Sequence, residues 1–407
     1  MNQKVKTVKL IFHFWVLFPL VKLMQLYFTL RGLFPKKRQR TILYLESLPI
    51  ENAGYQYRSY KWKQELEKLG WNVTVKTIIA DKKKYDQQRF ESDLIDYIIL
   101  AMWKRFGQVL CAGSYHAVVV RRELLQYNDY GHLFMERLLK AVNPNLILDF
   151  DDNIAAAKGE PRTIKNAVAR LLLEDGDKFL QTLKFYKKFI VGNKELERLV
   201  VDQAPQTKPG QILFIPTCVD YNQYPVKHYL PSAELKIGWI GGVGNLPYLD
   251  LLLPALVKIH PETPIRLVVI SGKDYIPKLE VPFVIENLQW SLETEVNQLL
   301  GIDIGVMPLP ANEMTSGKSG FKLLQYMGLG LVAIADGVGI NAAIVNNGVN
   351  GFLVGQAHDW YSAFKQCIAQ KDNWQAIGAA ARKTVDQTYT FEANRIKYSQ
   401  FLENIIE

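Results

Sequence analysis

The sequence predicts an α/β protein made of two doubly wound, Rossmann-like domains that face each other across a cleft. Short runs of β-branched and apolar residues alternate with longer amphipathic stretches, the pattern of parallel sheets covered by helices. The chain has 407 residues, of which 48% are hydrophobic, and this length is too great for one ordinary core. The series of strands is also interrupted once, by a polar stretch, so we expect one sheet on each side of it.

The first series of strands lies in residues 41–230, which we take as the first domain. Helical segments separate the strands, and Tyr57–Leu69 and Asn166–Lys187 are the clearest of them. The predicted strands are TILYLE (41–46), WNVTVKTII (71–79), HAVVVRR (116–122), NLILDFDD (145–152), KFIVGN (188–193) and ILFIP (212–216).

A second series follows the polar stretch YPVKHYLPSAE (224–234), and we place the second domain at residues 231–380. After His358 the pattern is helical, and the last predicted helix is Phe391–Glu407. The predicted strands are LKIGWIG (235–241), IRLVVIS (265–271), PFVIE (282–286), IDIGVMPL (302–309), LVAIAD (331–336) and GFLVG (351–355).

Residues 1–40 form an apolar and basic segment that we expect to associate with a membrane. The run Leu10–Val21 is shorter than the roughly 20 residues of a spanning helix, and no signal-peptide cleavage site follows it. A helix lying in the membrane interface is indicated instead, with a polar side opposite an apolar side. The polar side is Lys22, Gln25 and Thr29; the apolar side is Leu23, Leu26, Phe28 and Leu30; the cations for anionic head groups are Lys36, Lys37, Arg38 and Arg40. A helix packed on the protein's own surface is the alternative.

The formal charge of +9 suits an anionic partner such as nucleic acid, anionic lipid or a phosphorylated small molecule. No compact basic motif with interleaved aromatic residues appears, so we expect no nucleic acid. The cysteines, Cys111, Cys218 and Cys367, are far apart and form no CxxC pair. This argues against a disulfide framework or a zinc site and for a reducing, cytoplasmic compartment.

Two features of the second domain suit a nucleotide. Gly241, Gly242 and Asn245 lie between a strand and a helix, where glycines let the backbone approach a phosphate, although a plain tight turn fits as well. Trp290 follows another strand, where an aromatic ring can stack on a base or simply pack in the core.

The segment GKSGFKLLQYMGLG (317–330) has the strongest functional pattern. Lys318, Lys322 and Gln325 are spaced i, i+4 and i+7, so a helix through them would place all three on one face. Two ammonium groups beside a free helix N-terminus would stabilise a departing diphosphate. A solvated polar side of a helix is the plain alternative.

The first domain carries candidate acceptor-binding residues at strand ends. Gly54 and Arg58 follow the first strand, as a flexible loop and a cation at a helix start. Asp149, Asp151 and Asp152 end the fourth strand, and carboxylates so close together would raise one another's pKa unless paired with cations or a metal. They would orient an acceptor, bind Mg²⁺ or cap the next helix, and we favour an acceptor-site or structural role over a metal site.

The run from Trp290 to Val354 closely resembles the donor-binding half of group 1, GT4-type retaining glycosyltransferases of the GT-B fold, in the bacterial branch with a GKxxFKxxQYM signature. The motifs DIG, PL, GK, GFKLLQYM, GVG and NG-GFL come in the family's order. In the first domain, ILDFDDNI, IVGNKEL and FIPTCVDYNQY resemble that branch too, so the likeness covers most of the chain beyond Thr41.

The resemblance implies a nucleotide-sugar donor in the second domain, an acceptor in the first, and a terminal helix, residues 381–407, that packs back on the first domain. Lys318, Ser319, Gly320, Phe321 and Lys322 would hold sugar and diphosphate. Trp290 would lie near the base, and Gly241, Gly242 and Asn245 near the phosphates.

Two departures from the family pattern concern catalysis. The family's pair of acidic residues falls on Gly317 and Gln325, and GGVGNLPYL lacks the cations that usually follow the first donor strand. Our hypothesis is that Lys318 and Lys322 supply the missing charge, that Gln325 contacts ribose or sugar, and that Asp149 or Asp151 assists the acceptor.

The sequence therefore predicts a metal-independent, retaining glycosyltransferase at the cytoplasmic membrane face, acting in bacterial cell-surface polysaccharide synthesis. It would need no cofactor beyond its nucleotide-sugar substrate, and its acceptor would be a glycan or lipid-linked. One alternative is a catalytically inactive GT-B subunit that serves as the membrane-bound partner of an active transferase. An epimerase on the same fold would need acidic residues and histidines in the cleft, and histidines are few.

Overall fold

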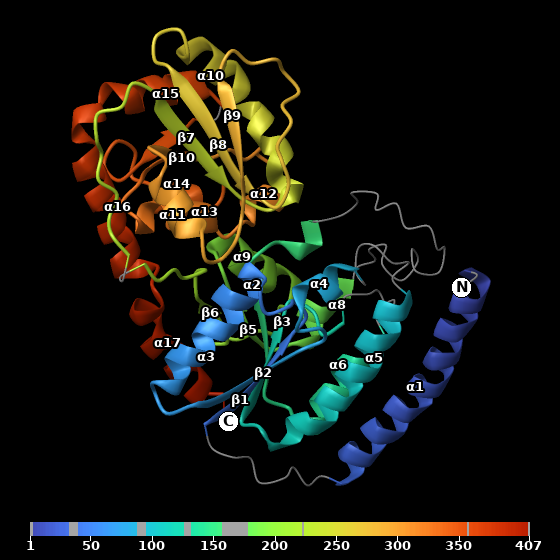
Figure 1. Ribbon diagram of the computed structural model, residues 1–407. Helices are drawn as coiled ribbons and strands as arrows, with labels where there is room; N and C mark the ends of the chain where they lie inside the picture. The colour runs from blue at the N-terminus through green and yellow to red at the C-terminus, as the bar shows by residue number, and fades with distance from the viewer. Residues whose placement is uncertain are drawn as a thin grey trace. The chain divides into compact units, whose positions relative to one another are not determined.

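The computed structural model describes residues 3–31, 40–87, 95–125, 132–156, 178–221, 224–355 and 358–405 (Figure 1). The chain divides into two compact units. The first unit consists of residues 1–215 and 395–407, and the second of residues 216–394. The units therefore divide ahead of the predicted boundary at residues 230 and 231. The expected cations Lys36, Lys37 and Arg38, and residues 166–177 of an expected helix, lie outside the described residues.

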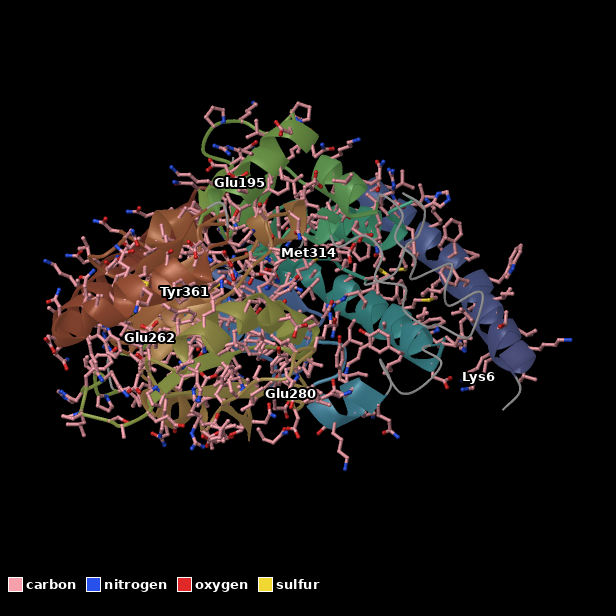
Figure 2. The ribbon with its side chains drawn as sticks, turned by 90° about the horizontal axis from the view of Figure 1, so that it is seen from above. Lys6, Glu195, Glu262, Glu280, Met314 and Tyr361 are labelled. Atoms are coloured by element: carbon pink, nitrogen blue, oxygen red, sulfur yellow. The ribbon has the colours of Figure 1, made fainter. Side chains whose placement is uncertain are left out.

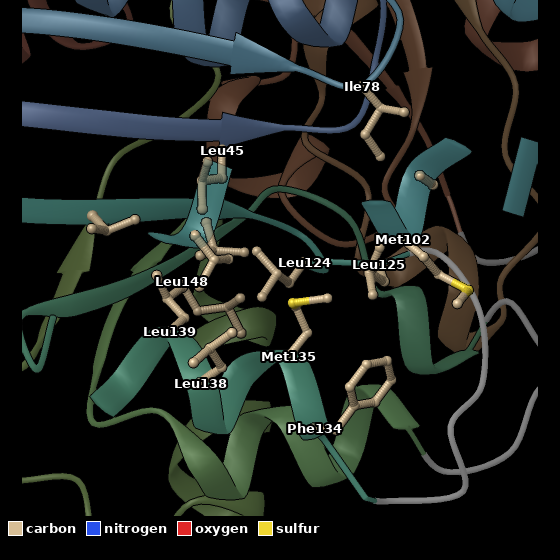
Figure 3. Packing of buried hydrophobic residues seen from close by; sticks show 14 of the residues in the cluster. Leu45, Ile78, Met102, Leu124, Leu125, Phe134, Met135, Leu138, Leu139 and Leu148 are labelled. Atoms are coloured by element: carbon tan, nitrogen blue, oxygen red, sulfur yellow. The ribbon is translucent and has the colours of Figure 1, made fainter. Parts of the chain in front are cut away.

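The first unit is built on a six-stranded parallel sheet in the order β2-β1-β3-β4-β5-β6. Apolar strands such as β3 and β4 are buried along their whole length, as expected for a sheet covered on both faces. Figure 3 shows part of this core, in which Leu45 and Leu148 from the sheet and Leu138 and Leu139 from α6 belong to one cluster. The strands are β1 (Thr41–Glu46), β2 (Asn72–Thr77), β3 (Ala117–Arg121), β4 (Leu146–Phe150), β5 (Lys188–Val191) and β6 (Ile212–Phe214).

The helices of the first unit cover this sheet. Near the N-terminus, α1 lies beside α5 and α6 (Figure 1). The helical segments are α1 (Gln3–Arg31), α2 (Ala53–Tyr55), the π-helical turn η1 (Gln56–Tyr60), α3 (Lys61–Glu67), α4 (Lys82–Asp86), α5 (Ile95–Leu110), η3 (Cys111–Ser114), α6 (Phe134–Val142), η4 (Ile154–Ala156), α8 (Lys178–Phe185) and α9 (Lys194–Gln203).

The C-terminal helix α17 (Phe391–Glu403) contributes its last turns to the first unit. The hydroxyls of Tyr398 and Tyr44 are 2.5 Å apart in the core, and the Trp71 indole donates to the Ser399 hydroxyl at 2.8 Å. Tyr44 of β1 and Trp71, which precedes β2, are thereby hydrogen-bonded to α17.

The second unit has a six-stranded parallel sheet in the order β12-β11-β10-β7-β8-β9. Its strands are β7 (Leu235–Ile240), β8 (Ile265–Ser271), β9 (Val284–Gln289), β10 (Ile304–Met307), β11 (Val332–Asp336) and β12 (Phe352–Val354). Its helical segments are η5 (Val243–Leu251), α10 (Leu253–Ile259), α11 (Glu295–Leu300), α12 (Glu313–Ser316), α13 (Phe321–Gly328), α14 (Asn341–Ile344), α15 (Trp360–Ala369), η6 (Lys371–Asn373) and α16 (Trp374–Thr388).

All twelve predicted strands are confirmed, and the two sheets confirm the predicted α/β class. Each sheet has a point at which the strand order changes direction, between β1 and β3 in the first unit and between β7 and β10 in the second. In open α/β sheets, ligands bind beyond the carboxyl ends of the strands at such switch points. The residues that follow β1, β3, β7 and β10 are therefore candidates for ligand binding.

Helix α13 is fastened over the switch point of the second sheet by one buried tyrosine. The amide of Ile240 in β7 donates to the Tyr326 hydroxyl at 3.1 Å, and this hydroxyl donates to the Val306 carbonyl in β10 at 3.2 Å. A methyl group on Gly305 would lie 2.4 Å from the Tyr326 ring, so β10 needs glycine there. The helix thus has a fixed position relative to both strands.

Candidate functional site

Gly241 and Lys322 come together at the switch point of the second sheet. Gly241 follows β7, and Lys322 lies in the first turn of α13. A methyl group on Gly241 would lie 2.5 Å from Cε of Lys322 and 2.6 Å from the Trp239 ring. The Lys322 ammonium is 5.4 Å from the centre of that ring, a cation–π distance. Glycine at position 241 therefore leaves the space that the lysine side chain occupies.

Hydrogen bonds through Ser271, the last residue of β8, connect Trp290 to Gly241. The Trp290 amide donates to the Ser271 carbonyl at 3.0 Å, and the Ser271 hydroxyl donates to the Gly241 carbonyl at 2.8 Å. The indole N–H donates to Oε2 of Glu295 in α11 at 2.9 Å. Because the indole N–H is used within the protein, a base at Trp290 would be recognised by stacking.

Lys318 does not lie on the helix that carries Lys322, so the prediction of one shared helical face is wrong. Helix α12 ends at Ser316 and α13 begins at Phe321, with Lys318 in the loop between them. Gly320 takes a φ of +68°, which separates the two helices. Gln325 does lie on α13, but it is buried, so it is not part of an exposed polar stripe.

The loop before α13 is held by residues that follow β11. A methyl group on Gly320 would lie 2.8 Å from Ile344 and 2.9 Å from Ile340. Asn341 donates from its side-chain amide to the Asp336 carbonyl at 3.1 Å. Ser319 is buried in this packing. The backbone of the loop is thereby fixed close to the start of α13.

Gly242 and Asn245 lie in the turn that opens η5. Gly242 is exposed, and a methyl group built on it meets no atom within 4 Å. The Asn245 amide donates to the Gly242 carbonyl at 2.9 Å. Among the predicted donor residues, this turn is the part most open to solvent.

Sequence reasoning missed an aspartate–histidine pair in the second unit. Asp336 ends β11 and is 1% exposed. Its Oδ2 accepts from the Leu309 amide, and its Oδ1 is 2.8 Å from Nδ1 of His358, which follows β12 with a φ of 51°. Burial raises the pKa of Asp336, while the bonds from Leu309 and His358 oppose this change. The sequence did contain a signal for Asp336, because it is an acidic residue at the end of the predicted strand LVAIAD. The aspartates of NLILDFDD were chosen as candidates for the same reason.

In the first unit, the predicted acceptor residues Arg58, Asp149 and Asp151 are joined in a buried ion cluster at the carboxyl ends of β3 and β4. Arg58 and Asp149 form an ion pair, and both side chains are nearly inaccessible to solvent. Arg58 also donates to the Ile215 carbonyl at 2.8 Å. Arg121 donates to Asp151 at 2.6 Å. Charge on Asp149 and Asp151 is therefore compensated inside the protein.

The outer end of this cluster reaches the surface. Arg122 follows β3 with a φ of 61°, and it donates to Asp152 at 2.6 Å and to Asp151 at 3.3 Å. The Asp152 side chain is 41% exposed. Gly54 lies apart from these ions: its amide donates to Asn52 at 2.8 Å, which caps the short helix α2. Of the predicted acceptor carboxylates, Asp152 is the accessible one.

The cluster argues against Asp151 as a proton acceptor. Burial alone would raise the pKa of Asp151, but Arg121, Arg122 and Arg58 outweigh burial and hold this pKa well below its usual range. A carboxylate with such a low pKa is a weak base, whereas a general base works best with a pKa near the operating pH. Within the described residues, no group of three or more histidine, cysteine, aspartate or glutamate side chains is placed to hold a metal ion.

Replacing Asp149 by alanine should destabilise the protein by about 3–5 kcal/mol, because it leaves the Arg58 guanidinium buried without its ion partner. Asp152→Ala is the matched control, since it removes an exposed partner of Arg122 and should cost less than about 1 kcal/mol. Urea unfolding of the two variants measures both values. Equal, small effects of the two substitutions would contradict the assigned structural role of Asp149.

Acid should also destabilise the protein through Asp151. Its native pKa is lowered, whereas an unfolded aspartate has a pKa of about 3.9, so the unfolded state binds more protons below about pH 4. The free energy of unfolding should therefore fall as the pH is lowered through this range. Asp151→Asn should reduce that slope by up to about 1.4 kcal/mol per pH unit. Unfolding curves between about pH 5 and pH 3 test this, and an unchanged slope would contradict it.

Gly241→Ala should destabilise the second unit by about 1–3 kcal/mol, because the new methyl group overlaps the buried Trp239 ring. Gly242→Ala, one residue along, adds a methyl group in open space at a backbone conformation that alanine adopts, and should change stability by less than about 0.5 kcal/mol. Thermal unfolding of both variants provides the comparison. Identical effects would show that Lys322 and Trp239 do not require glycine at position 241.

Comparisons with known proteins agree with this architecture. Residues 234–370 match the family model of glycosyl transferases group 1. The fold is similar to sucrose-phosphate synthase from Thermosynechococcus elongatus, with a TM-score of 0.62 and 13% identity over 90% of this chain and 99% of that one. The fold is also similar to a glycosyltransferase from Rickettsia africae ESF-5, with a TM-score of 0.62 and 14% identity over 92% of this chain and 100% of that one.

A third similar structure is Anabaena Alr3699/HepE in complex with UDP and glucose, with a TM-score of 0.58 and 14% identity over 90% of this chain and 100% of that one. The comparison with curated proteins finds no relative. At these identities, the likeness to solved structures shows the fold. The chain thus has the GT-B fold, and residues 234–370 of its second unit form the region that matches the glycosyl transferases group 1 family.

Proposed function

We propose that this protein is a glycosyltransferase that moves a sugar from a nucleotide-diphosphate sugar to a glycan or lipid-linked acceptor. One observation carries the proposal: Lys322, at the start of α13, lies against Gly241 at the switch point of the second sheet. Both residues fall within the region that matches the group 1 family. The HepE structures contain UDP, glucose or UDP-glucose, and we infer that this chain takes a donor of the same chemical class.

The chemistry follows from the charge of the leaving group. Negative charge develops on the diphosphate as the glycosidic bond breaks, so a cation and amide donors already in place lower the barrier. Lys322 would supply the cation at the start of α13, and Lys318 a second cation from the preceding loop. The amides at the start of α13 would add hydrogen bonds. Ser319, Gly320 and Phe321 would form the backbone of this pocket.

The remaining donor residues would bind the nucleoside and the sugar. Trp290 would stack on the base, and Gly242 and Asn245 would lie along the phosphates. Gln325 is buried, which argues against a ribose or sugar contact by its side chain. His358, oriented by Asp336, is a better candidate for a polar contact at this end of the sheet.

Transfer would proceed with retention and without a metal, with the acceptor hydroxyl attacking from the face that the diphosphate leaves. The first unit would bind the acceptor, and Arg122 and Asp152 are the members of its ion cluster that reach the surface. Arg58, Asp149 and Asp151 would then hold these loops in place. The departing phosphate would then accept the proton of the acceptor hydroxyl, since Asp151 is ion-paired.

The proposed place of action is the inner face of a bacterial membrane, in cell-surface polysaccharide synthesis, with contact through residues 1–40. Within the described residues, Lys4–Leu30 is the segment long and apolar enough to cross a membrane, with a mean hydropathy of 1.6. A spanning helix and a helix that lies on the surface can share this length and composition.

Lys322→Ala should reduce transfer by about 100-fold or more, the usual loss when one transition-state donor is removed. Lys258→Ala is the matched control, because Lys258 also lies near a ring, 5.8 Å from the centre of Tyr361, but on α10 rather than α13. Lys322→Arg keeps the charge and should retain part of the activity. Product formation from a panel of UDP-, GDP- and ADP-sugars provides the measurement.

Donor binding by calorimetry separates the possible outcomes. Full activity and unchanged donor affinity in Lys322→Ala would overturn the assigned site. A wild-type protein that binds a donor but neither transfers nor hydrolyses it would favour the inactive GT-B subunit, the alternative function.

A further inference from the structure

Helix α1 is packed lengthwise on the first unit by one apolar row. Leu10, Leu17 and Val21 are at most 1% exposed, and they belong to the same core cluster as residues of α5 and α6. Phe14, Met24 and Phe28 are partly buried against that cluster. These positions are separated alternately by four and three residues, which places them on one side of a helix. We call Leu10, Phe14, Leu17, Val21, Met24 and Phe28 the inner row.

Polar contacts add to the attachment of α1. The Trp103 indole of α5 donates to Nδ1 of His13 at 3.0 Å. Lys9 is 3.0 Å and Lys6 is 3.7 Å from the Asp96 carboxylate of α5. Figure 2 shows Lys6 on this helix, viewed from above. Because α1 packs on both α5 and α6, it cannot leave without exposing the apolar faces of these two helices.

The opposite side of α1 is also apolar, and it faces solvent. Its side chains are between 55% and 76% exposed, in a protein whose other large apolar residues are mostly buried. From the first to the last, they extend over roughly 33 Å at about 1.5 Å per residue. An apolar surface of this length marks an interaction site. We call these residues the outer row: Val8, Phe12, Trp15, Leu23, Leu26 and Leu30.

The charges around the outer row identify its partner. Helix α1 contains no aspartate or glutamate. Lys4 and Lys22 are exposed, and at 100° per residue they lie at one edge of the outer row, while Lys9, at the other edge, is ion-paired with Asp96 of α5. A second copy of this chain would bring equal charges together, which is unfavourable. Apolar side chains bordered by cations match the acyl chains and head groups of an anionic bilayer.

We propose that the outer row is a bilayer-contact face and that α1 lies in the plane of the membrane with the first unit behind it. The inner row is the reason that α1 does not span the bilayer, because spanning would strip this row from α5 and α6. Trp15, 76% exposed, suits the interface between acyl chains and water. The proposal does not depend on glycosyl transfer, and it corrects the sequence analysis in one respect: Phe28 packs on the core.

The test uses the full-length chain and flotation with vesicles of phosphatidylcholine, with and without phosphatidylglycerol. The variant Trp15→Glu/Leu23→Glu places two carboxylates in the outer row. The control Val201→Glu places one on α9, also in the first unit, where Val201 is 56% exposed. The wild type and the control should float with the anionic vesicles. The outer-row variant should bind them at least about tenfold less, with an unchanged melting temperature.

Three results would overturn the proposal. The first is equal flotation of the wild type and the outer-row variant. The second is a wild-type dimer that the variant dissociates without a change in flotation, because the outer row would then join two copies. The third comes from labelling in a Cys111→Ser background. Lys4→Cys and Thr29→Cys should both react with an impermeant maleimide added outside the vesicles, and failure of one of them to react would contradict a helix that lies in the plane of the membrane. Donor binding should be unchanged in the outer-row variant, so a failed donor site would appear separately.

Discussion

The candidate site depends on the hydroxyl of Tyr326, which joins the neighbouring strands β7 and β10 where the second sheet reverses its strand order. This contact requires glycine at position 305, because any side chain there would overlap the ring. With Tyr326 fixed, the first turn of the same helix places Lys322 over Gly241. The position of the lysine thus depends on a buried contact one helical turn away.

The two units handle charge in different ways at their switch points. In the first unit, Arg58 and Arg121 meet Asp149 and Asp151, so the buried ions neutralise one another. In the second unit, Lys322 lies on an aromatic ring and a glycine. A neutral cluster suits the support of loops around an uncharged acceptor hydroxyl, whereas a cation over an apolar ring suits a diphosphate. This difference favours donor binding in the second unit on grounds of charge alone.

The sequence predicted the strands well because apolar runs of fixed period are a local property. It also predicted the positions of Gly241 and Trp290 directly after strands and of Lys322 near the start of a helix. It failed where the outcome depends on contacts between distant segments. Gly320 separates Lys318 from α13 because it packs against Ile340 and Ile344, residues that follow a later strand. The helical spacing of the three polar residues contained no information about that packing.

The ion cluster shows the same limit. Asp149 and Asp151 are two residues apart, and their spacing is compatible with a metal, an acceptor or a cap. Their partners, Arg58 and Arg121, come from segments after β1 and at the end of β3, so the assignment needs the strand order, which the sequence pattern does not supply. Helix α1 is the clearest example. Its length and composition also satisfy a spanning helix, and the sequence left open whether it lies on a membrane or on the protein; the contacts of Leu10, Leu17 and Val21 show which side packs on the first unit.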